Sequence, residues 1–271
     1  MKRLCQIAGA IIVIGIVACI GGALFGGTSS SLRDLFQISS DLPDLDLFDI
    51  DSDQSDWTEM ELTGTDDVSA LSLDIDGAVL TVQTGDDWSL KSNKNGKGLE
   101  YSVSGNTFFL KQKALPRWWK QNQCAQLVLT IPSDITFDTI DASLDGSGFS
   151  TVGALSAKHV SLDADGADLT IENLDADSLD LDGDGADVQL SACLREDSSI
   201  DADAATVTLD LLDGSTISNV NTEFNLSTFT FNGKDYGDGL SGTIEKSIGT
   251  AKKGGTLSIT CDVGSIELTT P

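Results

Sequence analysis

Aspartates recur at a fixed spacing in the middle of the chain, and their pattern is the one most suited to chemistry. The segment LDADGADLTI begins at Leu162, LDGDGADVQL follows nineteen residues later at Leu181, and IDADAATVTL another nineteen later at Ile200. This register aligns three columns of carboxylates, namely Asp163, Asp182 and Asp201, then Asp165, Asp184 and Asp203, then Asp168 and Asp187. Like charges on adjacent strands repel, so we expect raised pKa values, counterions or a basic partner.

Calcium binding is the most specific hypothesis for these aspartates. The stretch DLDGDG, from Asp180 to Gly185, has the spacing that opens a calcium loop, and DADGAD from Asp163 is similar. Clustered carboxylate oxygens suit Ca²⁺. The candidate ligands are Asp163, Asp165, Asp180, Asp182 and Asp184. Ser191 stands where such a loop has its closing glutamate, and a nineteen-residue period differs from the nonapeptide calcium repeat. The pattern therefore favours a solvated acidic face, with a cation site as the alternative.

Catalysis by paired carboxylates is the second hypothesis. Two acidic groups can act as acid and base in glycoside hydrolysis. Here every repeat offers carboxylates and none stands out, and Lys158 and Arg195 are the only nearby basic residues that could hold an anionic sugar. The single histidine, His159, argues against histidine triads and histidine metal sites. We therefore expect a non-catalytic protein, with a polysaccharide-acting or cation-dependent carbohydrate-binding β-helix protein as the alternative.

One basic and aromatic segment, KQKALPRWWK, runs from Lys111 to Lys120. Its cations and tryptophans could contact anionic lipid or stack on sugar rings. A loop whose tryptophans cover the end of a repetitive core has the same composition, and we favour that interpretation.

The elements that carry the aspartates are predicted from the apolar positions of one repeat. These positions are Leu162, Ala164, Ala167, Leu169, Ile171, Leu174, Ala176 and Leu179, and they are separated by steps of two or three residues. Steps of two are strand alternation, and steps of three are corners that keep the next apolar side chain inside. The fold class is therefore all-β, a β-solenoid or β-helix with rungs of about 19 residues, and an antiparallel sandwich is the runner-up. On the same register Cys193 should lie inward beside Leu174, and Thr256 to Leu268 should form a terminal rung.

The N-terminal region predicts one transmembrane helix before the solenoid. Residues Ile7 to Phe25 carry no charge and are long enough to span a bilayer, and Lys2 and Arg3 precede them. The positive-inside rule leaves the N-terminus cytoplasmic and the body extracellular. The alternatives are a lipoprotein with Cys19 as its lipidated residue, or a cleaved signal peptide. The expected organisation is a membrane anchor at residues 1–27, an acidic flexible tether at 28–65, and a β-solenoid domain at 66–271.

The charge balance limits the partners. Sixteen basic residues against 43 acidic ones give a net charge of −27, which excludes nucleic acid as a default ligand. The partners that remain are the membrane, contacted through residues 7–25, and an unidentified protein or glycan of the cell envelope. We expect no cofactor other than the calcium considered above.

The repeats resemble a known family. LVLTIP from Leu127, the hydrophobic-x-hydrophobic-x-x-Gly rungs between residues 144 and 209, and the closing GTLSITCDVGSIEL from Gly255 are similar to the DUF4097-like bacterial envelope proteins called "putative adhesins". The resemblance covers about residues 66–271. It implies a surface-exposed, non-catalytic β-solenoid module, and it transfers no functional residue.

Overall fold

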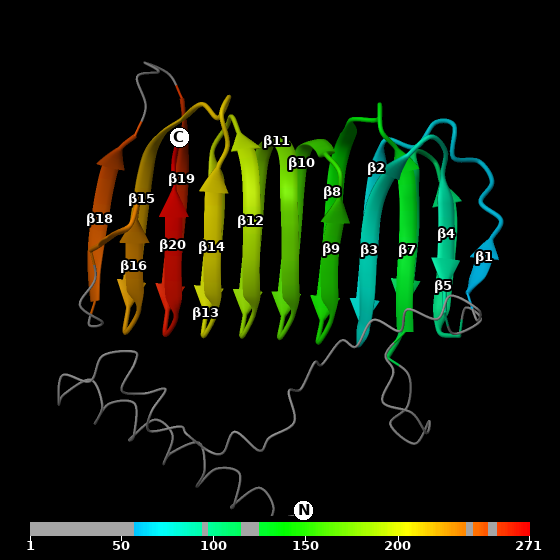
Figure 1. Ribbon diagram of the computed structural model, residues 1–271, viewed down its shortest axis with the longest axis horizontal. Helices are drawn as coiled ribbons and strands as arrows, with labels where there is room; N and C mark the ends of the chain where they lie inside the picture. The colour runs from blue at the N-terminus through cyan, green and yellow to red at the C-terminus, as the bar shows by residue number, and fades with distance from the viewer. Residues whose placement is uncertain (1–56, 94–96, 115–124, 237–240, 249–253) are drawn as a thin grey trace, which may run out of the picture. The chain divides into compact units, whose positions relative to one another are not determined.

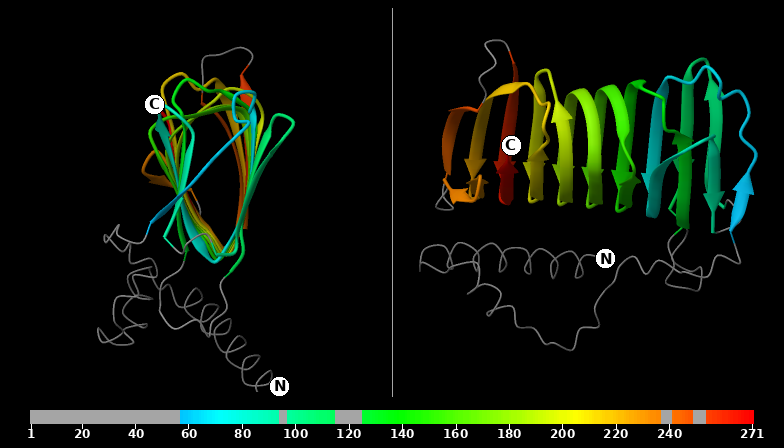
Figure 2. Two further views of the ribbon diagram at one scale, coloured as in Figure 1. Left: turned by 90° about the vertical axis from the view of Figure 1, so that its right-hand side faces the viewer. Right: turned by 45° about the horizontal axis from the view of Figure 1, so that its top comes forward.

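The structure is a computed structural model, and it describes residues 57–93, 97–114, 125–236, 241–248 and 254–271. All regular elements within these ranges are β-strands, and they wind into two faces that lie against each other. Seen end-on, the two faces form the limbs of a V, and from the side the strands stand next to one another along a rod (Figures 1 and 2). The all-β solenoid that the repeat predicted is confirmed.

Face 1 carries the two longer aspartate columns. In spatial order its strands are β5 (Leu99–Ser104), β6 (Thr107–Gln112), β2 (Ala70–Asp76), β8 (Phe137–Asp145), β10 (Leu155–Asp165), the second half of β11 (Asp168–Asp184), β13 (Ser198–Asp203), β19 (Gly255–Asp262), β15 (Ile217–Asn225) and β18 (Ser241–Ser247). All neighbours pair in parallel except β5 with β6 and β18 with β15, which are antiparallel at the two ends.

Face 2 completes the coil. Its strands, in spatial order, are β1 (Thr58–Met60), β4 (Ser89–Ser92), β7 (Ala125–Pro132), β3 (Ala78–Gly85), β9 (Gly148–Val152), the first half of β11, β12 (Asp187–Leu194), β14 (Thr206–Leu211), β20 (Ser265–Thr269), β16 (Thr228–Phe231) and β17 (Lys234–Asp235). Antiparallel strands again stand at both ends, where they cover edges that a parallel stack would leave open.

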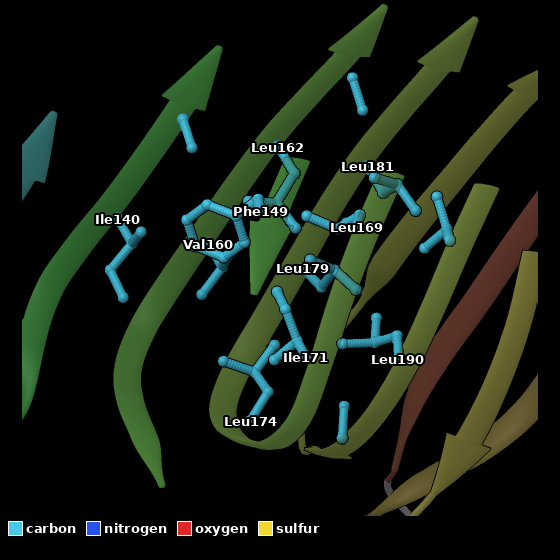
Figure 3. Packing of buried hydrophobic residues seen from close by; sticks show 14 of the residues in the cluster. Ile140, Phe149, Val160, Leu162, Leu169, Ile171, Leu174, Leu179, Leu181 and Leu190 are labelled. Atoms are coloured by element: carbon cyan, nitrogen blue, oxygen red, sulfur yellow. The ribbon is translucent and has the colours of Figure 1, made fainter. Parts of the chain in front are cut away.

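One continuous apolar core fills the space between the faces. Every inward position predicted for the repeat is buried, and Leu169, Leu174 and Leu179 are each no more than 1% exposed. Figure 3 shows these side chains packed together between the strands, with the ribbon bending around Leu174. Alternation therefore fixes the inward face of each strand, and burying it against the neighbouring rungs stabilises the stack.

The nineteen-residue register is confirmed in the pairing of β10, β11 and β13. Leu162 lies opposite Leu181, which lies opposite Ile200, and the aspartates beside them align in the same way. Parallel stacking of near-identical sequences therefore produces the carboxylate columns.

A tight turn joins face 1 to face 2 in the central rungs. Its second residue has a left-handed backbone, with φ of +57° at Gly166, +64° at Gly185 and +54° at Ala204. The turns also stack, because the Gly166 N–H donates to the Asp184 carbonyl at 2.7 Å and the Gly185 N–H to the Asp203 carbonyl at 2.8 Å. Glycine is favoured here because a side chain destabilises the left-handed conformation.

The order of the rungs in space differs from their order in the chain. The prediction of Thr256–Leu268 as a terminal rung is wrong: β19 and β20 lie between the β13/β14 rung and the β15/β16 rung. After β14 the chain skips one layer, forms β15 and β16, turns back through β17 and β18, and then fills the gap. The opposite end is built likewise, with β2 and β3 between β6/β7 and β8/β9.

The predicted register of Cys193 is also wrong, although its predicted burial is confirmed. Leu174 pairs with Ala192, whereas Cys193 lies opposite Asp175, because the register between β11 and β12 shifts between Ile171 and Leu174. The bend around Leu174 gives one strand a residue that its neighbour lacks. Cys193 is still buried, at 8% exposure.

The predicted anchor (residues 7–25), the alternative lipid site at Cys19 and most of the tether lie outside the described residues. Within the ranges given above, no helix is long and apolar enough to span a membrane. Strand β1 falls inside the stretch predicted as tether and pairs with β4, so ordered structure begins before residue 66. Of the basic and aromatic segment, the structure describes only residues 111–114.

Candidate functional site: the acidic face

Two columns of acidic side chains run along face 1. The edge column stands at the tight turns and consists of Asp76, Asp145, Asp165, Asp184, Asp203 and Asp262, with Asn225 after it. The inner column lies two residues earlier on each strand and contains Asp74, Ser143, Asp163, Asp182, Asp201, Thr260 and Glu223. The predicted columns are therefore confirmed, and the edge column is longer than the sequence repeat indicated.

The predicted third column, Asp168 beside Asp187, lies on face 2 just beyond the turn. Gly148 and Thr206 continue it in the neighbouring rungs, so it holds only two carboxylates. Burial, with the Asp187 charge as the second cause, raises the pKa of Asp168. The acidic surface therefore wraps around the turn in the central rungs.

Two aspartates of the inner column have raised pKa values. Partial burial is the main cause that raises the pKa of Asp163, and the charges of Asp165 and Asp182 add to it. Partial burial likewise raises the pKa of Asp201, with further contributions from Asp182 and Asp203. Both effects disfavour the ionised form.

Basic side chains lie beside this surface rather than along its centre. Lys158 pairs with Asp138 at 2.6 Å and Arg195 with Asp175 at 2.5 Å, while Lys111 pairs with Asp74 near one end of the inner column. Among the described residues, no lysine or arginine lies within 4.0 Å of Asp163, Asp182 or Asp201. The central part of the column therefore holds negative charge that the described chain does not balance.

The five calcium candidates divide into separate groups. Asp163 stands beside Asp182, and Asp165 beside Asp184, in two different columns. Asp180 belongs to a further column: its Oδ1 accepts a hydrogen bond from the Ser199 hydroxyl at 2.6 Å, and its Oδ2 lies 3.7 Å from His159 Nε2. Within the described ranges, no group of three or more acidic, cysteine or histidine side chains is arranged to hold a metal ion. The carboxylates form parallel rows and do not surround a common centre, because each strand contributes one outward carboxylate per column.

The regular repetition of the carboxylates is also relevant to catalysis. A retaining or inverting glycosidase distinguishes its two carboxylates by their environments. On face 1 adjacent rungs present near-equivalent aspartates, such as Asp182 and Asp201, and both are exposed. The parallel rows therefore support surface recognition better than acid–base chemistry.

Sequence reasoning did not extend the edge column to its outer members. Asp76 and Asp145 each precede a left-handed glycine, and Asp262 precedes Val263 with φ of +60°. The signal in the sequence that could have located them was an aspartate followed by a residue that forms the turn and then by a small residue. Insertions between the outer copies hid their alignment, because those copies depart from the nineteen-residue period.

The fold and surface define a β-solenoid with an acidic strand face. The family model described as "Toastrack DUF4097" matches residues 68–270, and the chain belongs to this family. No curated protein matches the chain.

Two solved structures are similar to the chain. One is described as a "putative cell adhesion protein" from Clostridium sporogenes: it is 15% identical with a TM-score of 0.43, and the match covers 79% of this chain and 100% of that one. The other is described as a "putative adhesin" from Bacteroides fragilis: it is 13% identical with a TM-score of 0.37, and the match covers 78% of this chain and 95% of that one.

Proposed function

We propose that the protein is a membrane-anchored, non-catalytic module of the bacterial cell envelope, with face 1 as its interaction or adhesion surface. The observation that carries this proposal is the inner column, in which Asp163, Asp182 and Asp201 stack without a basic partner among the described residues. A flat strand face with unbalanced charge suits an extended envelope protein or glycan that supplies hydrogen-bond donors or positive charge.

Adhesion is tested with cells that display the full chain. In one variant Asp163, Asp182 and Asp201 become asparagine, and in a control Glu172, Asp210 and Asp213 become the corresponding amides. Both variants lose three exposed carboxylates, but only the first alters the inner column. We expect the first variant alone to reduce retention of the cells on immobilised envelope material. Equal retention of the two variants would contradict the proposed surface.

Topology is tested separately. The uncharged run from Ile7 to Phe25, preceded by Lys2 and Arg3, supports a single-pass anchor with the body outside the cell. A protease added to intact, wall-stripped cells should therefore digest the solenoid. A solenoid that stays protected until lysis would refute this orientation.

A further inference from the structure

A pocket of about 520 Å³ lies where three loops meet near the β1 end of the solenoid. Leu62 comes from the β1–β2 connection, Trp88 from the β3–β4 connection, and Ile135 from the β7–β8 connection. Each of these connections interrupts the repeat, so the pocket occurs once while the aspartate columns recur. Its volume is within the usual range for small-ligand sites, roughly 300–1,000 Å³.

Trp88 gives the pocket a firmly held aromatic wall. Its ring centroid lies 5.4 Å from that of Phe108 and 6.2 Å from that of Phe137, and the second pair meets edge to face. Both phenylalanines are fully buried, whereas Trp88 is only partly buried. The core therefore anchors one part of the indole while another part remains available to a ligand.

The wall also combines apolar side chains with negative charge. Leu62 and Ile135 pack against the core while also lining the pocket. Asp66, Asp87 and Asp134 are also lining residues, and no lysine, arginine or histidine of the described chain lies within 4.0 Å of any of their carboxylates. A bare metal ion does not match an apolar and aromatic wall, because hard cations require a shell of oxygen ligands.

We propose that this pocket binds an organic ammonium ion, with the body of the ligand against Trp88 and the aliphatic wall and its ammonium among the carboxylates. Tryptophan is the best aromatic partner for a cation, and an ammonium–carboxylate contact is a strong, charge-assisted hydrogen bond. The chemistry is shared by an amino sugar and by a lysine side chain of a protein. The site is separate from face 1 and does not depend on the function proposed for that face.

Binding is tested on the full chain in neutral detergent by titration calorimetry, with two matched pairs of probes. Glucosamine is compared with N-acetylglucosamine, and Nα-acetyl-lysine methylamide with its Nε-acetylated form. We expect saturable binding of at least one amine and at least tenfold weaker binding of its acetylated partner, because acetylation removes the charge and keeps the body. Preference for glucosamine identifies an amino sugar as the source, and preference for the lysine derivative identifies a protein.

Substitutions test whether the amine binds in the pocket. Asp87→Asn with Asp134→Asn should weaken amine binding at least tenfold, whereas Asp210→Asn with Asp213→Asn removes two exposed carboxylates outside both the pocket and face 1 and should leave it unchanged. Trp88→Phe keeps an aromatic ring over Phe108 and should weaken binding several-fold, with thermal melting as the check on folding. The proposal is overturned if neither amine saturates, if acetylated and free amines bind equally, or if the control variant loses binding as much as the pocket variant.

Discussion

Exchanging the turn residues of two neighbouring rungs should produce opposite changes in stability. Gly185 and Ala204 occupy equivalent turn positions, with φ of +64° and +54°. A Cβ at Gly185 would meet no atom within 4 Å, so Gly185→Ala introduces backbone strain without a steric clash. Ala204 is exposed, so Ala204→Gly removes strain with little loss of packing.

The magnitude follows from two opposing terms. A left-handed conformation destabilises an L-residue by about 1–2 kcal/mol relative to glycine. Glycine loses about 0.4–1 kcal/mol more conformational free energy on folding than alanine does. The difference between the midpoints of these ranges predicts that Ala204→Gly stabilises by about 0.8 kcal/mol and that Gly185→Ala destabilises by a similar amount. In a domain of this size the melting temperature should move by about 2–3 °C in each direction.

The assay is thermal unfolding of the full chain in neutral detergent at pH 7, followed by circular dichroism. The double exchange should melt close to the wild type, with a small coupling because the Gly185 N–H donates to the Asp203 carbonyl. Ala202→Gly is the control: Ala202 is fully buried in β13, so glycine there should lower the melting temperature. Changes of the same sign for both turn substitutions would refute the reasoning.

Three further predictions concern the core, the pH dependence and calcium. Leu169→Asp or Val188→Asp should destabilise the protein by at least about 3 kcal/mol, because each places an unpaired charge in the core. Asp182→Ser, on an outward position, should be neutral or stabilising. If the core and surface variants melted at the same temperature, the assignment of inward and outward positions would be contradicted. The folded pKa values of Asp163 and Asp201 are raised, so the stability linked to these groups is fully present below the unfolded value near 4 and is lost as the pH rises through the folded pKa values. Asp163→Asn with Asp201→Asn should therefore melt progressively higher than the wild type between pH 4 and 7, and a difference that does not change with pH would count against this linkage. Added salt should raise the melting temperature at pH 7, and CaCl₂ should raise it no more than NaCl of equal ionic strength does. An increase in melting temperature that is specific to calcium, and that the double variant Asp182→Asn with Asp184→Asn lacks, would establish a cation site.

The central rungs were predictable from the sequence because their physics is local. Alternation places Leu169 inward and Asp168 outward, and near-identical neighbours leave only one register that aligns the apolar side chains. The aspartate columns follow from that register, and they appear where they were expected.

The ends were not predictable because they depend on contacts between segments distant in the chain. Nothing in the repeat indicates that β19 pairs with both β13 and β15. The pocket around Trp88 was missed for the same reason, since its three loops become neighbours only when β2 and β3 take their place between later strands. Cys193 was misplaced because a bend can absorb one residue without changing the apolar pattern.

The interleaved rung at the β18 end also dictates the sequence of events during folding. A chain made from its N-terminus presents β15 and β16 before β19 and β20 exist. Until those later strands arrive, the edges of β13 and β14 have no native neighbour on that side, and β15 and β16 lack their parallel partners. The rung formed by β15 and β16 therefore cannot dock directly on β13 and β14, so this end of the rod cannot grow one rung at a time in chain order, as a simple repeat protein does.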